Sequence, residues 1–176
     1  MATILITGTN KGVGLELVKI YAARGDTVIA TCRDPESASA LSEVSGAVEV
    51  LGVSVGDDAS VASLAKALEG RVIDVLINNA GTSGPARDQQ TTFAMDFEGW
   101  ADAFNINSMA PVRVMQALLP NLRLSSAAKV MTVTSQMGAL SLDMPAAHAY
   151  CATKAAVNKF MRLAALDLKK ENIAVG

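Results

Sequence analysis

The sequence has few residues of the kinds that build covalent cross-links and metal sites. Its 176 residues include two cysteines and one histidine, and neither a CxxC pair nor a Cys/His ligand spacing occurs. This excludes a disulfide framework, gives no reason to expect a metal ion, and is typical of a protein in a reducing compartment. Cys32, Cys151 and His148 are therefore interpreted as packing residues rather than reactive groups.

An excess of positive charge and a long apolar run are also missing. Lysine and arginine number 15 against 17 aspartates and glutamates, so the net charge is -2. Because binding to a phosphate backbone needs the opposite imbalance, nucleic acid is not an expected partner. The first residues, MATILITGTNKGVG, contain no basic segment ahead of an apolar core, and their apolar run is too short to cross a bilayer. We expect a soluble, cytoplasmic protein without a membrane partner.

What the chain does have is apolar residues in a regular order. Hydrophobic residues make up 51% and charged residues 18%, enough for the core of one domain. Short β-branched runs predict strands at Thr3–Thr7, Thr27–Cys32, Ala47–Val53, Val72–Asn78 and Lys129–Thr134, with a sixth from Ile173. Apolar spacings of three and four predict helices at Gly12–Arg24, Pro35–Val44, Asp58–Glu69, Gly99–Leu122 and Ala149–Glu171.

The alternation of these strands and helices indicates the fold class. The strands are apolar at consecutive positions, which fits parallel strands covered by helices on both faces. We therefore predict a single α/β domain with a doubly wound parallel sheet in three layers, α/β/α. The only long irregular segment, Thr82–Glu98, is interpreted as a loop near the functional site.

Three glycines, Gly8, Gly12 and Gly14, follow the first expected strand where the chain enters a helix. Glycine permits positive φ and a close backbone approach, and the amides at a helix N-terminus attract phosphate oxygens. A dinucleotide pyrophosphate is therefore the natural ligand. By itself, the pattern leaves open the alternative of a tight turn that needs glycine only for its shape.

The glycines have the spacing TGxxxGxG. In this spacing and in four further motifs, the sequence resembles the classical short-chain dehydrogenase/reductase family. The other motifs are NNAG at Asn78–Gly81, FNINSMAP with Asn107, VTVTSQMG with Ser135, and YCATK with Tyr150 and Lys154. The resemblance implies a Rossmann fold, a nicotinamide cofactor and a catalytic tetrad made of the last four residues named. Through TCRDPE and its general length, the chain is also similar to small carbonyl reductases of the sniffer and C-factor kind. By the same resemblance the nucleotide would contact Gly8, Asn10, Lys11, Gly12, Val13, Gly14, Arg33, Ser54, Asn79, Ala80, Gly81, Tyr150 and Lys154.

The tetrad also makes physical sense. Tyr150 and Lys154 are four residues apart and so share one helix face, where the ammonium, with an oxidised nicotinamide, favours the phenolate. Ser135 ends a strand at the sheet edge where ligands bind in open α/β folds, so its hydroxyl can hold a substrate oxygen. For Asn107 the resemblance implies a water held beside the lysine. The alternative for the pair is the polar face of an ordinary amphipathic helix.

The cofactor's identity can be argued from charge. A ribose 2′-phosphate needs a cation after the second strand, whereas a free 2′-hydroxyl needs an acid there. Arg33 takes that position and Lys11 lies in the glycine loop, so we expect NADP(H). Asp34, one residue later, leaves NAD(H) possible. Ser54 stands where the family often has an aspartate near the adenine, and it is a weaker acceptor.

These residues together predict an oxidoreductase that moves a hydride between NADP(H) and a small carbonyl or alcohol, with Tyr150 as acid and base. The rival hypothesis is a non-catalytic nucleotide sensor or interaction protein on the same fold, which would not need the whole tetrad. Substrate contacts are expected in the stretch 136–147, with Gln136, Met137 and Met144 as candidates. Its apolar residues predict either a substrate pocket or ordinary packing.

Two further expectations concern the rest of the protein. The resemblance implies a homodimer or homotetramer through the helices Gly99–Leu122 and Ala149–Glu171. The residues from Asn172 to Gly176 indicate the opening of a sixth strand rather than a complete one. We therefore expect residues 1–176 to be one NADP(H)-binding domain without a C-terminal substrate-binding segment.

Overall fold

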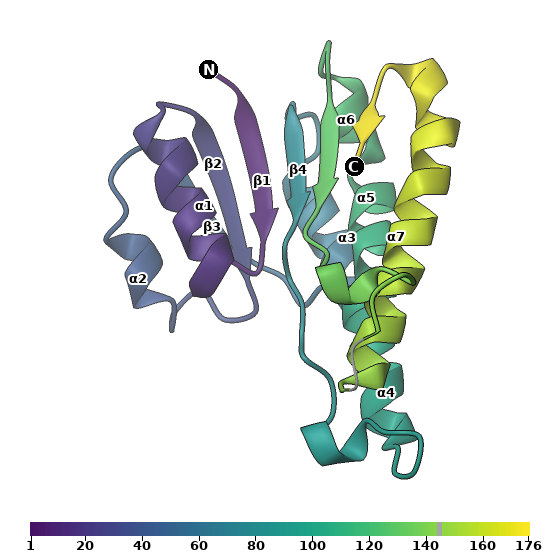
Figure 1. Ribbon diagram of the computed structural model, residues 1–176. Coiled ribbons are helices and arrows are strands. Elements are labelled where there is room, and N and C mark those ends of the chain that lie inside the picture. The colour runs from purple at the N-terminus through teal and green to yellow at the C-terminus, as the bar shows by residue number, and fades with distance from the viewer. Residues whose placement is uncertain (144–145) are drawn as a thin grey trace.

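A computed structural model describes residues 1–143 and 146–176, which form one domain around a parallel sheet (Figure 1). The sheet order is β3-β2-β1-β4-β5-β6. The strands are β1 (Thr3–Thr7), β2 (Thr27–Cys32), β3 (Val48–Gly52), β4 (Val75–Asn78), β5 (Lys129–Thr132) and β6 (Ala174–Val175). The order reverses between β1 and β4, and this is the place where open sheets of this kind bind ligands.

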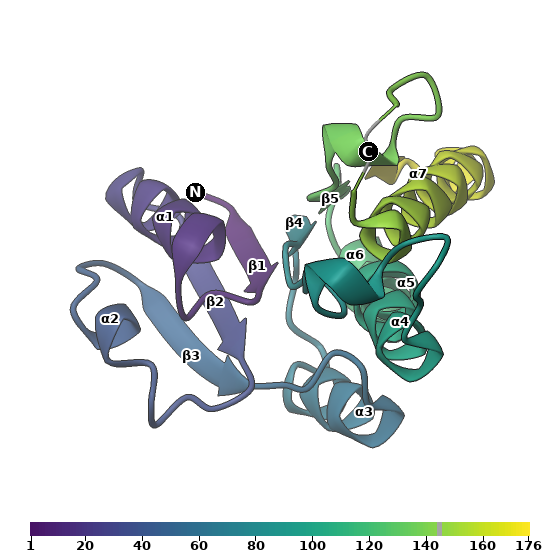
Figure 2. The ribbon, with the colours of Figure 1, turned by 60° about the horizontal axis from the view of Figure 1, so that its bottom comes forward.

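Helices cover both faces of the sheet. They are α1 (Gly12–Ala23), α2 (Ser39–Ser42), α3 (Asp58–Ala67), α4 (Phe97–Phe104), α5 (Ala110–Ala117), α6 (Leu119–Arg123) and α7 (His148–Leu168). Figure 2 shows α1 and α2 on one side of the sheet and α3, α5 and α7 on the other. The predicted doubly wound fold with three α/β/α layers is confirmed.

The alternation of side chains along each strand explains the two apolar layers. In β1, Ile4 and Ile6 belong to the cluster formed with α1, whereas Leu5 points into the cluster formed with α3, α5 and α7. All three side chains are at most 2% exposed. A strand that is buried on both faces needs apolar residues at consecutive positions, which is the pattern read from the sequence.

The long helix predicted over Gly99–Leu122 is divided into several pieces. Helix α4 begins earlier, at Phe97, where the Asp96 side chain caps the amide of Gly99. A π-helical turn at Asn105–Met109 separates α4 from α5, and Pro120 lies at the start of α6. Proline lacks the amide that a continuous helix requires, so the break before α6 has a direct cause.

Two other elements begin at least three residues later than predicted. The helix expected at Pro35–Val44 is reduced to α2, because the chain first makes a turn in which the amide of Ala38 bonds to the carbonyl of Pro35. The strand expected from Val72 begins at Val75, because the amide of Ile73 bonds to Asn121 outside the sheet. Within the described residues, none of the helices has both the length and the apolar character needed to cross a membrane.

Candidate active site

Three positions in the glycine loop between β1 and α1 favour glycine, because of either backbone conformation or lack of space. Gly8 and Gly12 have φ values of +70° and +59°, in the left-handed region that glycine adopts without strain. At Gly14 the constraint is space, because a Cβ there would stand 2.2 Å from the carbonyl oxygen of Gly8. The loop therefore folds tightly against the first turn of α1.

A cleft of about 860 Å³ opens at the carboxyl ends of the strands, beside this loop. Apart from Tyr150 and Lys154, it gathers all the residues expected to contact a nucleotide: Gly8, Asn10, Lys11, Gly12, Val13, Gly14, Arg33, Ser54, Asn79, Ala80 and Gly81. It also includes Thr82, Ser83, Gly84 and Pro85, which belong to the loop that was expected near the site. Sequence reasoning missed the other lining residues: Cys32, Val53, Val55, Gly99, Asp102, Ala103 and Ile106. The residues at strand ends could have been predicted, because ligands bind at the carboxyl ends of parallel strands. The residues on α4 and the π-helical turn could not, because nothing in the sequence around them indicates that they face the cleft.

The cleft fits a phosphorylated nucleotide. No heavy atom lies within 4 Å of where a Cβ of Gly12 would stand, so there is open space beside the start of α1. The first turn of α1 contains no acidic side chain, and the exposed side chains of Lys11 and Arg33 line the cleft. Helix N-termini and nearby cations both favour an anion. Asp34, which could favour a free ribose, is exposed and does not line the cleft among the described residues.

A set of hydrogen bonds joins β4 to the glycine loop. The hydroxyl of Thr7 accepts from the amides of Asn79 and Ala80, each at 3.0 Å. The side chain of Asn79 donates to the carbonyls of Thr7 and Gly8, each at 2.9 Å. Thr7, which is 1% exposed and was not predicted as a site residue, therefore holds the NNAG segment at the wall of the cleft.

Tyr150 and Lys154 lie on one face of α7, as their spacing predicts. The Nζ of Lys154 is 5.8 Å from the centroid of the Tyr150 ring and donates to the carbonyl of Val133 at 2.9 Å. The Lys154 side chain is buried, and burial lowers its pKa because the charged form loses its hydration. The ammonium is thus held beside the phenol ring by a single carbonyl that follows β5.

Asn107 lies within the π-helical turn and is 1% exposed. Its Oδ1 accepts from the amide of Thr82 at 2.8 Å, and its Nδ2 donates to the carbonyl of Thr82 and the hydroxyl of Thr153 at 2.8 and 3.0 Å. A Cβ at Gly81 would stand 3.2 Å from this Oδ1 and 3.8 Å from Nζ of Lys154. Asn107 and Lys154 therefore both lie next to Gly81, where a larger residue would crowd Asn107.

Ser135 follows β5 and caps the short 3-10 helix at Gln136–Gly138, where its Oγ accepts from the amide of Met137 at 3.1 Å. Met137 lines a separate cavity of about 600 Å³ between this helix and α7. The described residues around that cavity include Leu140, Leu142, His148 and Cys151 but neither Ser135 nor Tyr150. Gln136 is exposed, and the predicted contact Met144 lies outside the described residues.

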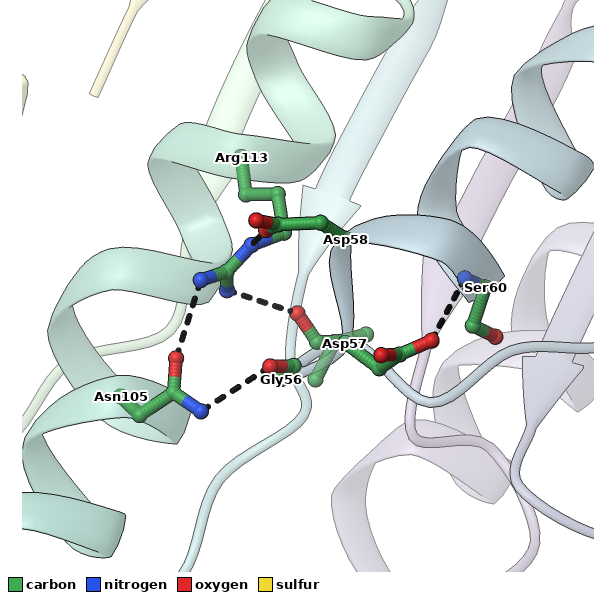
Figure 3. A network of polar contacts seen from close by, with 7 residues as sticks. Gly56, Asp57, Asp58, Ser60, Asn105 and Arg113 are labelled. Carbon is green, nitrogen blue, oxygen red and sulfur yellow. Dashed lines mark hydrogen bonds and ion pairs between the residues drawn. The ribbon is translucent and has the colours of Figure 1, made fainter.

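A polar network behind the cleft joins the loop after β3 to the π-helical turn (Figure 3). Arg113 on α5 donates to the carbonyl of Val55 and to Oδ1 of Asn105, both at 3.0 Å, and pairs with Asp58. Asn105 in turn donates to the carbonyl of Gly56 at 3.0 Å. Because Val55 lines the cleft, this network supports one of its walls from the outside.

Comparisons with known proteins agree with this arrangement. The family model described as short chain dehydrogenase matches residues 2–176. The chain is 36% identical over 181 residues to the short chain dehydrogenase gsfK of Penicillium aethiopicum, covering 96% of this chain and 71% of that protein. It is 41% identical over 100 residues to C-signal of Myxococcus xanthus, covering 56% of this chain and 58% of that protein.

Among solved structures, the chain is similar to one titled as the Pseudomonas aeruginosa RhlG/NADP active-site complex. The TM-score is 0.88 at 29% identity, and the match covers 99% of this chain and 70% of that one. The chain spans 63% of the length of the FixR protein of Bradyrhizobium diazoefficiens, to which 98% of this chain is matched. The substrates and partners of a full-length relative therefore do not carry over directly to this chain.

Proposed function

The chain belongs to the short-chain dehydrogenase/reductase family, and we propose that it is an NADP(H)-dependent oxidoreductase that interconverts a carbonyl compound and an alcohol, with Tyr150 as acid and base. The observation that carries the proposal is the position of the Lys154 ammonium. The side chain is buried, and its Nζ lies 5.8 Å from the centroid of the Tyr150 ring and close to Gly81, which lines the nucleotide cleft. Within the described residues this buried ammonium has no carboxylate partner, which is unfavourable, so its place beside a phenol calls for a functional reason.

When bound, the nicotinamide cofactor supplies or accepts the hydride. The chain's own residues manage the proton: Tyr150 donates it to the carbonyl oxygen in reduction and removes it from the alcohol in oxidation. The ammonium of Lys154 has three N–H donors, of which Val133 takes one, and it lies beside the Tyr150 ring.

Ser135 is suited to hold the substrate oxygen. A hydroxyl has one donor and two acceptor sites, and the amide of Met137 uses an acceptor site. The hydroxyl proton of Ser135 is then left to donate to the oxygen of a carbonyl compound. Asn107, through Thr82 and Thr153, keeps the backbone around Lys154 in place. The water that the family resemblance implies beside Asn107 remains a prediction.

The preference for NADP(H) over NAD(H) rests on the charges at the cleft. Lys11 and Arg33 both line it, and neither forms an ion pair within the described residues. Two cations without carboxylate partners favour the 2′-phosphate of NADP(H). Asp34 would support NAD(H) only if its side chain turned toward the cleft.

A homodimer or homotetramer is proposed through α4, α5 and α7. Exposed apolar side chains from these helices and the π-helical turn, Phe104, Met109, Phe160 and Leu163, are between 37% and 49% exposed. Several of them line a groove of about 440 Å³. Because contiguous apolar surface of this kind favours association, light scattering at micromolar concentration should give at least twice the monomer mass. A monomer would contradict the proposal.

The proposed reaction can be tested by a screen of aldehydes, ketones and alcohols with NADP(H) and with NAD(H), followed through the absorbance of the reduced nicotinamide. We expect turnover with at least one carbonyl–alcohol pair and a preference for NADP(H). Tyr150→Phe is the matched control, since it removes only the phenolic oxygen. Binding of NADPH without turnover of any compound would instead support the nucleotide sensor.

A further inference from the structure

Gln90 is a buried polar residue in the segment between β4 and α4, and its side chain has three hydrogen bonds. It is 2% exposed. Its Nε2 donates to the carbonyls of Ser83 and Pro85 at 3.0 and 2.5 Å, and its Oε1 accepts from the backbone amide of Tyr150 at 3.1 Å. Its own carbonyl accepts from the amide of His148 at 3.2 Å. Two segments far apart in the sequence are thus joined by one residue.

The first turn of α7 needs such a partner. The first amides of any helix have no acceptor within the helix, and they are normally satisfied by a capping side chain. The residue before α7 is Ala147, which has no polar side chain and adopts a left-handed φ of 56°. Gln90 provides from outside what the local sequence lacks, because it accepts from the amides of both His148 and Tyr150.

The other end of Gln90 is attached to the wall of the cleft. Ser83, Gly84 and Pro85 all line it. Gly84 has a φ of +79°, and a Cβ at this position would stand 3.6 Å from Nε2 of Gln90. The carboxamide therefore bonds a glycine-containing turn of the nucleotide cleft on one side and the helix that carries Tyr150 on the other.

We propose that Gln90 is a positioning residue for Tyr150, which joins the start of α7 to the Ser83–Pro85 wall of the cleft so that the phenol keeps its place relative to the bound nucleotide. This proposal rests on the proposed function of Tyr150. It assigns the two ends of the carboxamide different effects. The oxygen positions the acid–base residue, and the nitrogen positions the wall against which the nucleotide binds.

Two substitutions separate these effects. Gln90→Met keeps the length of the side chain but removes every polar contact that it makes. Gln90→Glu keeps an oxygen to accept from Tyr150, at a helix N-terminus that favours negative charge, but places an acceptor against the carbonyls of Ser83 and Pro85. Gln89→Met is the matched control, because its side chain is exposed and its neighbour's contacts are unchanged.

We expect one variant to change mainly kcat and the other to change mainly the affinity for the nucleotide. Gln90→Met should lower kcat roughly 10- to 100-fold, because a small displacement of a reacting group costs about that much. Gln90→Glu should keep most of kcat but weaken NADPH binding, measured by fluorescence titration without substrate. Gln89→Met should match the wild type in both. Equal losses of kcat in Gln90→Met and Gln90→Glu would overturn the proposal, as would an unchanged kcat in Gln90→Met.

Amide hydrogen exchange in the protein without nucleotide gives a readout independent of activity. The amide of Tyr150, which bonds to the side chain of Gln90, should exchange faster in Gln90→Met than in wild type and remain protected in Gln90→Glu and Gln89→Met. The amide of His148 bonds to the backbone carbonyl of residue 90, which all the variants keep, and should change less. If the exchange rates of amides throughout the chain rise by a similar factor in Gln90→Met, the residue stabilises the fold generally and the positioning role is wrong. If the wild type turns over no carbonyl or alcohol, the proposed function fails, whereas the exchange comparison still decides whether Gln90 holds α7.

Discussion

The two ends of the candidate site are built by different means. At the nucleotide end, the cleft is bordered by a backbone turn whose shape requires Gly8, Gly12 and Gly14. At the end that carries the proposed acid–base pair, side chains hold segments that are distant in the sequence, as Lys154 does by donating to the backbone carbonyl of Val133. The first end is a local property of a short piece of chain, and the second exists only when the whole sheet has formed.

This difference implies different sensitivities to substitution. At the nucleotide end, affinity should respond to added bulk in the backbone turn and to charge near the 2′-phosphate. At the other end, nucleotide affinity should be largely unaffected, and the rate of proton transfer should change instead. Measurements that separate affinity from rate therefore test the comparison directly.

The largest effect is expected for Tyr150→Phe. The ring still packs in the same place, and only the group that carries the proton is lost. We expect kcat to fall by about 10²- to 10⁴-fold, the usual contribution of acid–base catalysis, with NADPH affinity nearly unchanged. Steady-state kinetics and fluorescence titration give the two quantities. Retention of more than about a tenth of the wild-type rate would be incompatible with Tyr150 as the acid.

The next largest effect is expected for Arg33→Ala at the nucleotide end. Losing a charge-assisted bond to the 2′-phosphate should weaken NADPH binding by about 1.5 to 3 kcal/mol and leave NADH binding nearly constant. Lys66→Ala, which removes an exposed cation on α3, is the control for charge alone. Equal losses for the two nucleotides would show that Arg33 does not contact the 2′-phosphate.

Gly14→Ala should have a somewhat smaller effect, and it tests the backbone argument. The new Cβ would stand 2.2 Å from the carbonyl oxygen of Gly8, so the loop must shift, at a cost of about 1 to 3 kcal/mol in unfolding free energy. Gly12→Ala is the matched variant, because its Cβ meets open space and only backbone strain remains. Denaturant unfolding should show Gly14→Ala as the less stable of the two. The reverse order would show that backbone conformation, not space, limits the loop.

What could be predicted from the sequence follows the same division. The parallel α/β sheet was predictable because buried strands such as Ile4–Ile6 carry their pattern in consecutive residues, and the glycine loop because its constraints are local. The break in the long helix at Asn105–Met109 was not, since it occurs where Asn107 bonds to Thr82 and Thr153. Gln90 was missed for the same reason, because nothing near it in the sequence indicates that it bonds to α7.

The smallest effect concerns Lys154 and the dependence of stability on pH. Burial lowers the pKa of this lysine from 10.5, so between the lowered pKa and 10.5 the unfolded chain holds a proton that the folded chain has released. The free energy of unfolding must therefore rise with pH across that window, and the cost of the buried charge is present in full only below it. Lys154→Met has no such group, so wild-type stability should rise relative to the variant as pH increases toward 10.5 in denaturant titrations. A difference between the two proteins that stays constant with pH would mean that the ammonium is hydrated in the folded state, and that this end of the site is more open to water than the burial of Lys154 indicates.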